Sequence, residues 1–480
     1  MRKIFRGALV VGLIAVAGEA VADDKVTNEL LLKEIRELKA RVQQLESQPS
    51  SAPKQNQRQD TDSAGELEAL TAETPSANSA TTAAQKVASA NPKNDGSTSY
   101  LRDLASNTTV GGYASTEFEN FQGADSTFDP HRFVLNIASQ VHQRVKFYSE
   151  VELEHGATFG GESSGEGSIS IQDANGNGVI DADEAQDIGV EVESESGRGG
   201  EIELEQAWAE FALNDNFGVR SGVILVPFGK FNLYHDDDLQ NLTDRPLVSR
   251  RVIPTTWSDA GVGLVGQTEL GEGAALGGQL YLINGLTDEF SAGAGGTRDG
   301  RGSLEQDNNN NKAVVGRLNF SPMLGQELGV SGYYGSYDDE SNAIGAAAID
   351  WDLAAGDFQL MGEAALFSFE NGLTSDGAPV PNNIAGLYGE LNYKFWFSAL
   401  NQTLLGSSFT DPKLVASFRY NYAEVDRRGD LAELDEEGFV AGLAYRPVQN
   451  FVLKTEYQWN DGDLERKNAD GFIGSIALGF

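Results

Sequence analysis

The residues best suited to chemistry form an acidic motif, DANGNGVIDADE, at positions 173–184. Its spacing matches the calcium-binding loop of an EF-hand, where oxygen ligands stand at positions 1, 3, 5, 7, 9 and 12 and a glycine makes the turn at position 6. Gly178 occupies that sixth position. The expected ligands are side-chain oxygens of Asp173, Asn175 and Asn177, the carbonyl of Val179, a water held by Asp181, and the carboxylate of Glu184. The motif predicts one bound Ca²⁺ with a structural role.

The flanks of this motif lack the paired amphipathic helices of an EF-hand. Ser168-Ile169-Ser170 and Asp187-Ile188-Gly189 are too short and too polar to form them. We therefore expect an isolated loop with the weak affinity of extracellular modules, a Kd of about 10⁻⁴–10⁻³ M. The alternative is a plain solvated turn, because acidic Gly-Asn loops also occur without metal.

A second charged group lies in residues 229–257, GKFNLYHDDDLQNLTDRPLVSRRVIPTTW. It carries basic side chains beside acidic ones. Inside a water-filled channel, such opposed charges would set a transverse field that selects solutes by charge and dipole. The alternative is an ordinary solvated loop. The expected constriction residues are Lys230, His235, Asp236, Asp237, Asp238, Arg245, Arg250 and Arg251.

Enzymatic chemistry has little support in the sequence. Gly261, Gly263 and Gly266 fit the dinucleotide pattern GxGxxG, but they lie in an alternating, strand-like segment with no helix after it. The four histidines, His131, His142, His155 and His235, have no nucleophile motif around them. We expect no catalytic residues.

The composition excludes several classes of protein. Among 480 residues, 72 are Asp or Glu and 35 are Lys or Arg, which gives a net charge of −37. Phosphates would repel so acidic a chain, so nucleic acid is excluded as a partner. The absence of cysteine excludes disulfides and zinc–thiolate sites. Beyond the N-terminus, no apolar run approaches the ~20 residues of a membrane-spanning helix.

The first 107 residues predict three segments ahead of the main domain. Residues 1–22 read as a cleaved signal peptide, with a basic start, an apolar stretch and the cleavage site Ala20-Val21-Ala22. Residues 24–48 predict a coiled coil, since Leu31, Ile35, Leu38, Val42 and Leu45 follow heptad spacing. Asn28 at a core position favours two strands in it. Residues 49–107 are a polar linker that cannot bury a core.

From residue 108 to Phe480, apolar and polar residues alternate with period two in segments of ~9–13 residues. The pattern predicts a transmembrane antiparallel β-barrel of sixteen strands, with one face for lipid and one for water. The expected strands are 109–121, 131–139, 144–155, 201–213, 217–228, 258–269, 275–286, 312–321, 326–337, 343–354, 356–369, 384–396, 412–424, 437–446, 451–461 and 471–480.

The connections agree with this count. An even number of strands returns both ends of the chain to the periplasmic side of an outer membrane, where connections are short. Most connections after even-numbered strands are short and most after odd-numbered strands are long. Two do not fit: 397–411 is long for a periplasmic turn, and 338–342 is short for an outer loop. The alternative is a soluble β-sandwich or a secreted β-solenoid.

Three runs of residues resemble those of a known protein family. DPHRFVLNIASQVHQRVKFYSEVELEHG, GEIELEQAWAEFALNDNFGVRSGVILVPFG and SRRVIPTTWSDAGVGLVGQ resemble the phosphate-selective porin O and P family, and the match extends more loosely to Phe480. The terminal Phe480 also resembles the C-terminal signal of outer-membrane assembly. The resemblance implies a homotrimer, a periplasmic coiled coil, and contact with outer-membrane lipids and lipopolysaccharide.

The family's specialised members select anions with an arginine ladder and a lysine cluster, and this sequence departs from that pattern. The expected lumen cations are few: Lys146, Arg220, Arg317, Arg419 and Lys454. The expected lumen acids are Glu117, Glu119, Glu150, Glu152, Glu154, Glu203 and Glu205. We therefore expect passive diffusion of small hydrophilic solutes and ions, non-specific or cation-leaning. The alternatives are a phosphate- or polyphosphate-selective anion channel, and a structural tether or adhesin whose helix and linker contact peptidoglycan.

Overall fold

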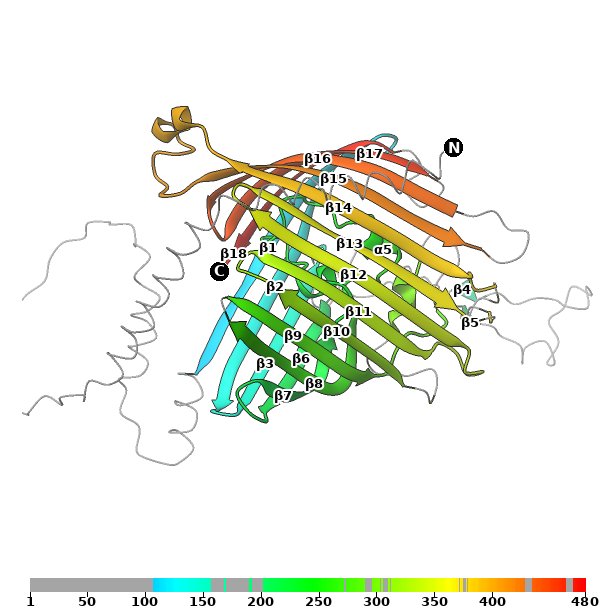
Figure 1. Ribbon diagram of the computed structural model, residues 1–480. Helices are drawn as coiled ribbons and strands as arrows, with labels where there is room; N and C mark the ends of the chain where they lie inside the picture. Colours follow the sequence, from blue (N-terminus) through cyan, green and yellow to red (C-terminus); the bar gives the residue numbers. More distant parts are fainter. Residues whose placement is uncertain are drawn as a thin grey trace, which may run out of the picture. The chain divides into compact units, whose positions relative to one another are not determined.

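The main domain is a closed β-barrel in which every neighbouring pair of strands is antiparallel (Figure 1). The computed structural model describes residues 107–156, 168–169, 190–191, 202–271, 273–289, 296–302, 304, 310, 312–370, 372–373, 377, 379–427, 434–462 and 469–480. The predicted signal peptide, coiled coil and linker lie outside this set, as does the predicted calcium motif. No helix within the described residues is both long and apolar enough to cross a membrane.

The predicted count of sixteen barrel strands is confirmed. Each strand pairs with its neighbours in sequence, except that β3 pairs directly with β6 and that β1 pairs with β18 to close the barrel. Two further short strands, β4 (Ser168–Ile169) and β5 (Val190–Glu191), pair only with each other. In the sequence they flank the predicted calcium motif. The barrel strands are β1 (Thr108–Phe121), β2 (Thr127–His142), β3 (Val145–Glu154), β6 (Ile202–Ala212), β7 (Phe217–Leu225), β8 (Ser258–Gly271), β9 (Ala274–Ile283), β10 (Ala313–Ser321), β11 (Gln326–Ser336), β12 (Ala343–Ala355), β13 (Phe358–Phe369), β14 (Asn383–Phe395), β15 (Lys413–Asp426), β16 (Leu434–Val448), β17 (Phe451–Gly462) and β18 (Gly471–Gly479).

Strand alternation separates an apolar outer face from a polar inner face, because successive side chains of a strand point to opposite sides of the sheet. In β15, Phe418 is exposed on the outside, whereas its neighbours Ser417 and Arg419 are buried within the barrel. In β17 the same holds for Tyr457 between Glu456 and Gln458. The outer face suits lipid and the inner face suits water and charged side chains.

The two ends of the barrel differ in the length of their connections. Connections such as 213–216, 322–325, 356–357 and 449–450 are tight turns at one end. The two predicted exceptions are present in the structure: Ser336 and Ala343 are joined by a short connection at the loop end, and residues 396–412 form a long projection at the turn end. That projection contains the 3₁₀ helix η5 (Ser398–Gln402) and stands away from the strands (Figure 1).

The C-terminal residue takes part in closing the barrel. β1 pairs with β18 from Tyr113 opposite Gly479 to Phe121 opposite Gly471. Beyond this ladder, the Gly112 amide donates to the Phe480 carbonyl at 3.1 Å, and the Phe480 amide donates to the Gly112 carbonyl at 2.9 Å. The Phe480 ring stacks on Phe133 of β2. The terminal Phe480 thus extends the pairing of first and last strands by one residue.

Candidate pore constriction

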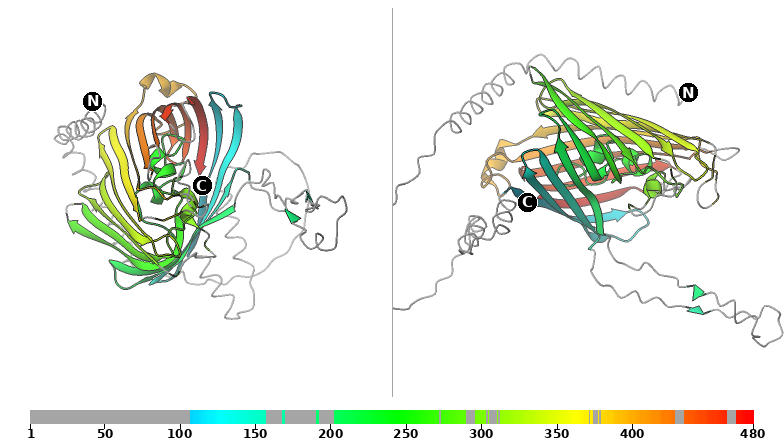
Figure 2. Two further views of the ribbon diagram at one scale, coloured as in Figure 1. Left: turned by 90° about the vertical axis from the view of Figure 1, so that its right-hand side faces the viewer. Right: turned by 90° about the horizontal axis from the view of Figure 1, so that it is seen from below.

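The connection between β7 and β8 folds into the barrel instead of extending outward. Its two ends stay together, since Leu225 pairs with Ser258 and the Val226 amide donates to the Trp257 carbonyl at 2.8 Å. Between them, residues 227–256 form the 3₁₀ helix η3 (Phe231–Leu233) and the short helix α5 (Leu247–Arg251). In the left view of Figure 2, green helical turns lie inside the ring of strands, in keeping with the inward course of this connection. We call residues 226–257 the inward segment.

Apolar packing explains why this segment enters the lumen. Phe228, Val248, Val252, Ile253 and Trp257 of the inward segment are fully buried. The ring of Phe228 lies 5.2 Å from Phe367 of β13, and the ring of Trp257 lies 5.2 Å from Tyr333 of β11, measured between centroids. Aromatic pairs at such distances add to the gain from burial. The segment therefore covers the inner wall over β11–β14.

Polar contacts fix the beginning of the segment to the same wall. The Gly229 amide donates to Ser331 Oγ at 3.1 Å, and the Phe231 amide donates to Glu363 Oε2 at 3.1 Å. Lys230 Nζ lies 2.9 Å from Asp352 Oδ2. Gly229 has a φ of +77°, and a Cβ at this position would lie 2.4 Å from Glu363 Oε1, so glycine is required here.

The middle of the segment contacts the opposite wall. Lys454 of β17 donates to the Asp237 carbonyl at 2.7 Å, and Glu456 of β17 accepts from the Thr243 amide at 2.6 Å. Ser115 of β1 donates to Asp237 Oδ2 at 2.5 Å. The inward segment thus spans the lumen from β11–β13 to β17 and β1, and it narrows the channel.

All eight residues predicted for the constriction lie on this segment. His235 and Asp237 are buried, and Lys230, Asp236, Asp238 and Arg245 are partly buried. Arg250 Nη1 lies 3.4 Å from Asp244 Oδ2, and Arg251 Nε lies 4.0 Å from Glu436 Oε2 of β16. Opposite charges are therefore close together within the narrowed part.

The carboxyl groups of the segment differ in their ionisation. Burial raises the pKa of Asp236 to about 7, with Glu150 and Asp238 adding repulsion, against the partial effect of His235. Burial also opposes ionisation of Asp237, but Arg132 and Lys454 outweigh it and hold the pKa of Asp237 well below its usual range. Burial raises the pKa of Asp238 more modestly. Asp237 is thus a fixed negative charge, whereas Asp236 titrates near neutral pH.

His235 connects the segment to the wall formed by β3 and β6. Its Nδ1 faces the Asn232 carbonyl at 3.2 Å, and its Nε2 lies 3.4 Å from Glu205 Oε1 of β6. Both side chains are fully buried. Burial, with repulsion from Arg245, lowers the pKa of His235 to about 4, so the imidazole is neutral at physiological pH.

Each predicted lumen cation with a described partner faces a carboxylate or a carbonyl. The pairs include Arg220 with Glu210 at 2.7 Å, Arg317 with Asp350 at 2.6 Å, and Arg419 with Glu390 at 3.6 Å. Lys146 is exposed and lies 3.8 Å from Glu210. Of the predicted lumen acids, Glu117, Glu150, Glu152 and Glu205 are buried inside the barrel, while Glu119, Glu154 and Glu203 are partly buried.

Sequence reasoning missed several residues of the site. Arg132 of β2 lies 2.7 Å from both Glu152 and Glu154 and 4.0 Å from Asp237. Arg446 of β16 donates to the carbonyls of Asp238 and Gln240, each at 2.8 Å. From the β9–β10 connection, Arg298 and Arg301 donate to the carbonyls of Thr255 and Thr256. Period-two alternation could have placed Asp350, Glu363 and Glu390 in the lumen, but no local signal marks Arg298 or Arg301.

The GxGxxG pattern lies inside strand β8, and β9 follows it without a helix. A Cβ on Gly263 would lie 2.3 Å from the Leu280 carbonyl of β9 and 2.3 Å from the Tyr281 ring. Close approach between neighbouring strands accounts for this glycine. The predicted strand context of the pattern, with no helix after it, is confirmed.

Comparisons with known proteins identify the family. The model of the phosphate-selective porin O and P family matches residues 109–357, more than half of the chain. An uncharacterized protein of Aquifex aeolicus (strain VF5) is 24% identical over 385 residues, covering 75% of this chain and 77% of the relative.

Solved structures give weaker similarities. Salmonella typhi OmpF in complex with daunomycin has 12% identity and a TM-score of 0.48, covering 78% of this chain and 97% of that one. The anion-selective porin from Comamonas acidovorans has 11% identity and a TM-score of 0.43, covering 78% and 99%. The outer-membrane channel DcaP of Acinetobacter baumannii has 10% identity and a TM-score of 0.45, covering 78% and 97%.

The family match and the closed barrel lead to the same conclusion about location and class. A sixteen-stranded barrel with an apolar outer face is built for the bacterial outer membrane, and its lumen is wide enough to hold a water-filled channel. The chain belongs to the phosphate-selective porin O and P family, whose members are outer-membrane channels for the diffusion of solutes.

Proposed function

We propose that this porin lets small hydrophilic solutes and ions diffuse passively and prefers cations to anions. The observation that carries this proposal is the pairing of the lumen cations. Arg132, Lys230, Arg317 and Arg419 each lie within 3.6 Å of a carboxylate, so little positive charge is left to attract an anion. Among the described residues, buried carboxyl groups outnumber these cations; Asp237, Glu205 and Glu436 are further examples. A negative lumen enriches cations.

Ion selectivity should respond to the charges of the inward segment. At an effective dielectric constant of about 40, one charge about 10 Å from the pore axis contributes roughly 0.8 kcal/mol, a factor of about four in relative permeability. Changing both Arg250→Glu and Arg251→Glu should therefore raise the cation preference severalfold. The measurement is the reversal potential of single channels in a planar bilayer under a salt gradient.

Lys413→Glu is the matched control for this experiment. Lys413 lies at the turn end of β15, and its side chain is half exposed beside Asp411. Its reversal should leave selectivity nearly unchanged. An equal shift in both variants would mean that Arg250 and Arg251 do not lie at the constriction.

One observation favours the alternative of an anion channel. Arg245 and Arg419 line a small hollow beside the segment, together with Thr243 and the acids Asp237, Asp244 and Glu390. Arg245 Nη2 is buried and has no hydrogen-bond partner among the described residues. A strong anion preference in the same reversal-potential measurement would support this alternative and contradict the proposal. A folded protein without conductance would support the tether or adhesin instead.

The cation preference should increase with pH through about 7. Asp236 is neutral below its raised pKa of about 7 and negative above it, so it adds a lumen charge only at higher pH. His235, whose pKa is lowered to about 4, does not change its charge in this range. Reversal potentials at pH 6 and pH 8 test this. Asp236→Asn should reduce the difference between pH 6 and pH 8, and an unchanged difference would assign the pH effect to other buried carboxyl groups such as Glu150.

The assembly is proposed as a homotrimer in contact with outer-membrane lipids and lipopolysaccharide. The family match supports this, since the sequence resemblance implies trimeric porins. The predicted coiled coil and its copy number lie outside the described residues. The mass of the full chain in detergent decides the question, and a stable dimer would contradict the trimer. Ca²⁺ at residues 173–184 stays a prediction.

A further inference from the structure

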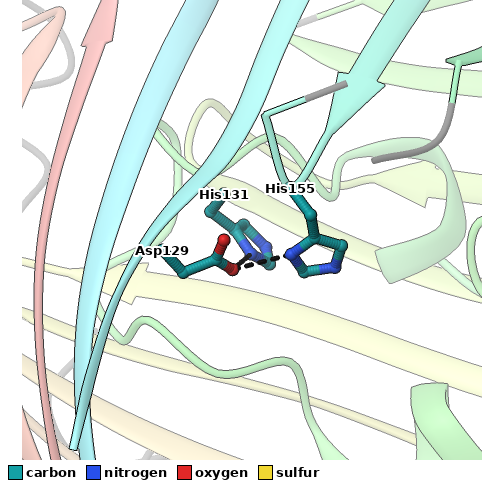
Figure 3. A group of neighbouring side chains, drawn as sticks. All are labelled: Asp129, His131 and His155. Atoms are coloured by element: carbon teal, nitrogen blue, oxygen red, sulfur yellow. Dashed lines mark hydrogen bonds and ion pairs between the residues drawn. The ribbon is translucent and has the colours of Figure 1, made fainter. Parts of the chain in front are cut away.

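Three side chains of metal-binding types meet at the loop end of β2 and β3, where one of them, His131, also lies close to Asp237 of the inward segment. They are Asp129, His131 and His155 (Figure 3). Asp129 Oδ2 lies 2.7 Å from His155 Nδ1 and 3.4 Å from His131 Nδ1. All three donor atoms lie within 4.8 Å of one another. Neither the predicted constriction nor the predicted calcium motif includes any of these residues.

The strand pairing brings the two histidines together. Arg132 of β2 is opposite Glu154 of β3, and the next pair in this antiparallel register is His131 opposite His155. The His155 amide accordingly donates to the His131 carbonyl at 2.9 Å. The site therefore rests on the end of the β2–β3 ladder, with His155 held directly after the last residue of β3.

A bulge brings the donor atoms of β2 to the same place. The pairing of β1 with β2 shifts its register between Ser115 and Glu117, so that Pro130 and His131 both fall opposite Thr116. Proline has no amide hydrogen and is tolerated in a strand at such bulges. As a result, His131 can reach Asp129 and Glu117 while its neighbour Arg132 reaches Glu152 and Glu154.

The donor set suits a transition metal. Two imidazole nitrogens and one carboxylate oxygen are the ligands preferred by Zn²⁺ and similar ions, whereas Ca²⁺ and Mg²⁺ take oxygen alone. Ligand atoms around a tetrahedral Zn²⁺ lie about 3.3 Å apart, given metal–ligand distances of about 2.0–2.2 Å. Small side-chain rotations from the observed distances would satisfy this geometry. A fourth position stays open for water or a passing ligand.

The surroundings of His131 match those of a metal ligand. With Nδ1 directed to the site, its Nε2 lies 3.8 Å from Glu117 Oε1, and Glu117 is buried. A carboxylate at the second ring nitrogen is a common support for metal-binding histidines, because it orients the ring and increases its basicity. The nearby cation, Arg132, is already paired with Glu152 and Glu154. His155 is more than half exposed, which gives an ion access.

We propose that Asp129, His131 and His155 bind a divalent transition-metal ion, with Zn²⁺ as the reference, at the loop end of the barrel. The competing explanation is a simple ion pair of Asp129 with a protonated histidine. The proposal does not depend on the ion selectivity of the channel, since it concerns equilibrium binding at the loop end.

Calorimetric titration of the full-length, untagged protein in detergent with ZnCl₂ tests the site. The background is low, because the chain has four histidines and no cysteine. We expect one Zn²⁺ per chain, and His155→Ala and Asp129→Asn should each weaken binding by roughly ten-fold or more. The affinity should also fall as the pH decreases, because protons compete with the metal for the imidazole nitrogens.

His142→Ala is the matched control. His142 ends β2 at the turn end of the barrel, far along the strand from His131, and its loss should leave Zn²⁺ binding unchanged. Glu184→Gln separates the predicted calcium motif, because it should affect Ca²⁺ binding alone. Because His155 is exposed, its replacement should not prevent folding. Equal Zn²⁺ affinity in the wild type and in His155→Ala would overturn the proposal.

Discussion

Replacing Arg132 with methionine should lower the free energy of unfolding by about 3–5 kcal/mol, the usual cost of removing one partner from a buried ionic group. The Arg132 side chain is almost fully buried, and its guanidinium lies 2.7 Å from Glu152 and 2.7 Å from Glu154. Without it, these carboxylates and Asp237 of the inward segment would repel one another with little access to water. Equilibrium urea unfolding followed by tryptophan fluorescence gives the free energy.

Lys413→Met provides the comparison. Lys413 Nζ lies 2.8 Å from Asp411 Oδ2, but both side chains are about half exposed or more, so its removal should cost no more than about 1 kcal/mol. Combining Arg132→Met with Glu152→Leu should recover part of the lost stability, since fewer unpaired charges then stay buried. If Arg132→Met costs no more than Lys413→Met, water must screen the charges around Arg132.

Most of the fold could be predicted from the sequence because a barrel is a local pattern repeated many times. In β17, the alternation of Leu453, Lys454, Thr455 and Glu456 already assigns one residue set to lipid and the other to the lumen. The predicted and observed strands differ mainly at their ends; β2, for example, starts at Thr127 instead of residue 131. Strand ends depend on pairing with neighbours, which alternation does not encode.

The candidate site could be predicted only in part. The charged residues of the inward segment stood out because they are contiguous in sequence. Their partners are scattered along the sequence: Arg132 contacts Glu152, 20 residues later, and Asp237, 105 residues later. The bulge at Pro130, which lets His131 and Arg132 face separate groups of carboxylates, depends on the register of β1. Such contacts follow from the closed barrel, and a single sequence contains no local sign of them.

Removing the inward segment should give the largest change in conductance. Leu225 pairs with Ser258 and the Val226 amide bonds to the Trp257 carbonyl, so β7 and β8 already approach each other as a hairpin does. Replacing residues 227–256 with Asn-Gly would close this hairpin by a two-residue turn. Since a sixteen-stranded barrel leaves an aqueous channel, single-channel conductance should rise by a factor of about 2 or more.

A matched deletion at the turn end shows whether the effect belongs to the constriction. Residues 397–411 project away from the barrel (Figure 1) and are mostly exposed, and Phe395 pairs with Leu414 at their base. Replacing 397–411 with the same turn should leave conductance unchanged.

A milder variant, Lys454→Met with Glu456→Gln, keeps the inward segment in place. It removes the hydrogen bonds of Lys454 to Asp237 and Leu242, and it weakens those that Glu456 accepts from Thr243 and Asp244. It should increase current fluctuations in the open channel, because the far side of the segment is then held by fewer contacts, chiefly those of Arg446, Arg419 and Ser115. Folded deletion variants with the conductance of the wild type would show that the narrowest part of the channel lies elsewhere.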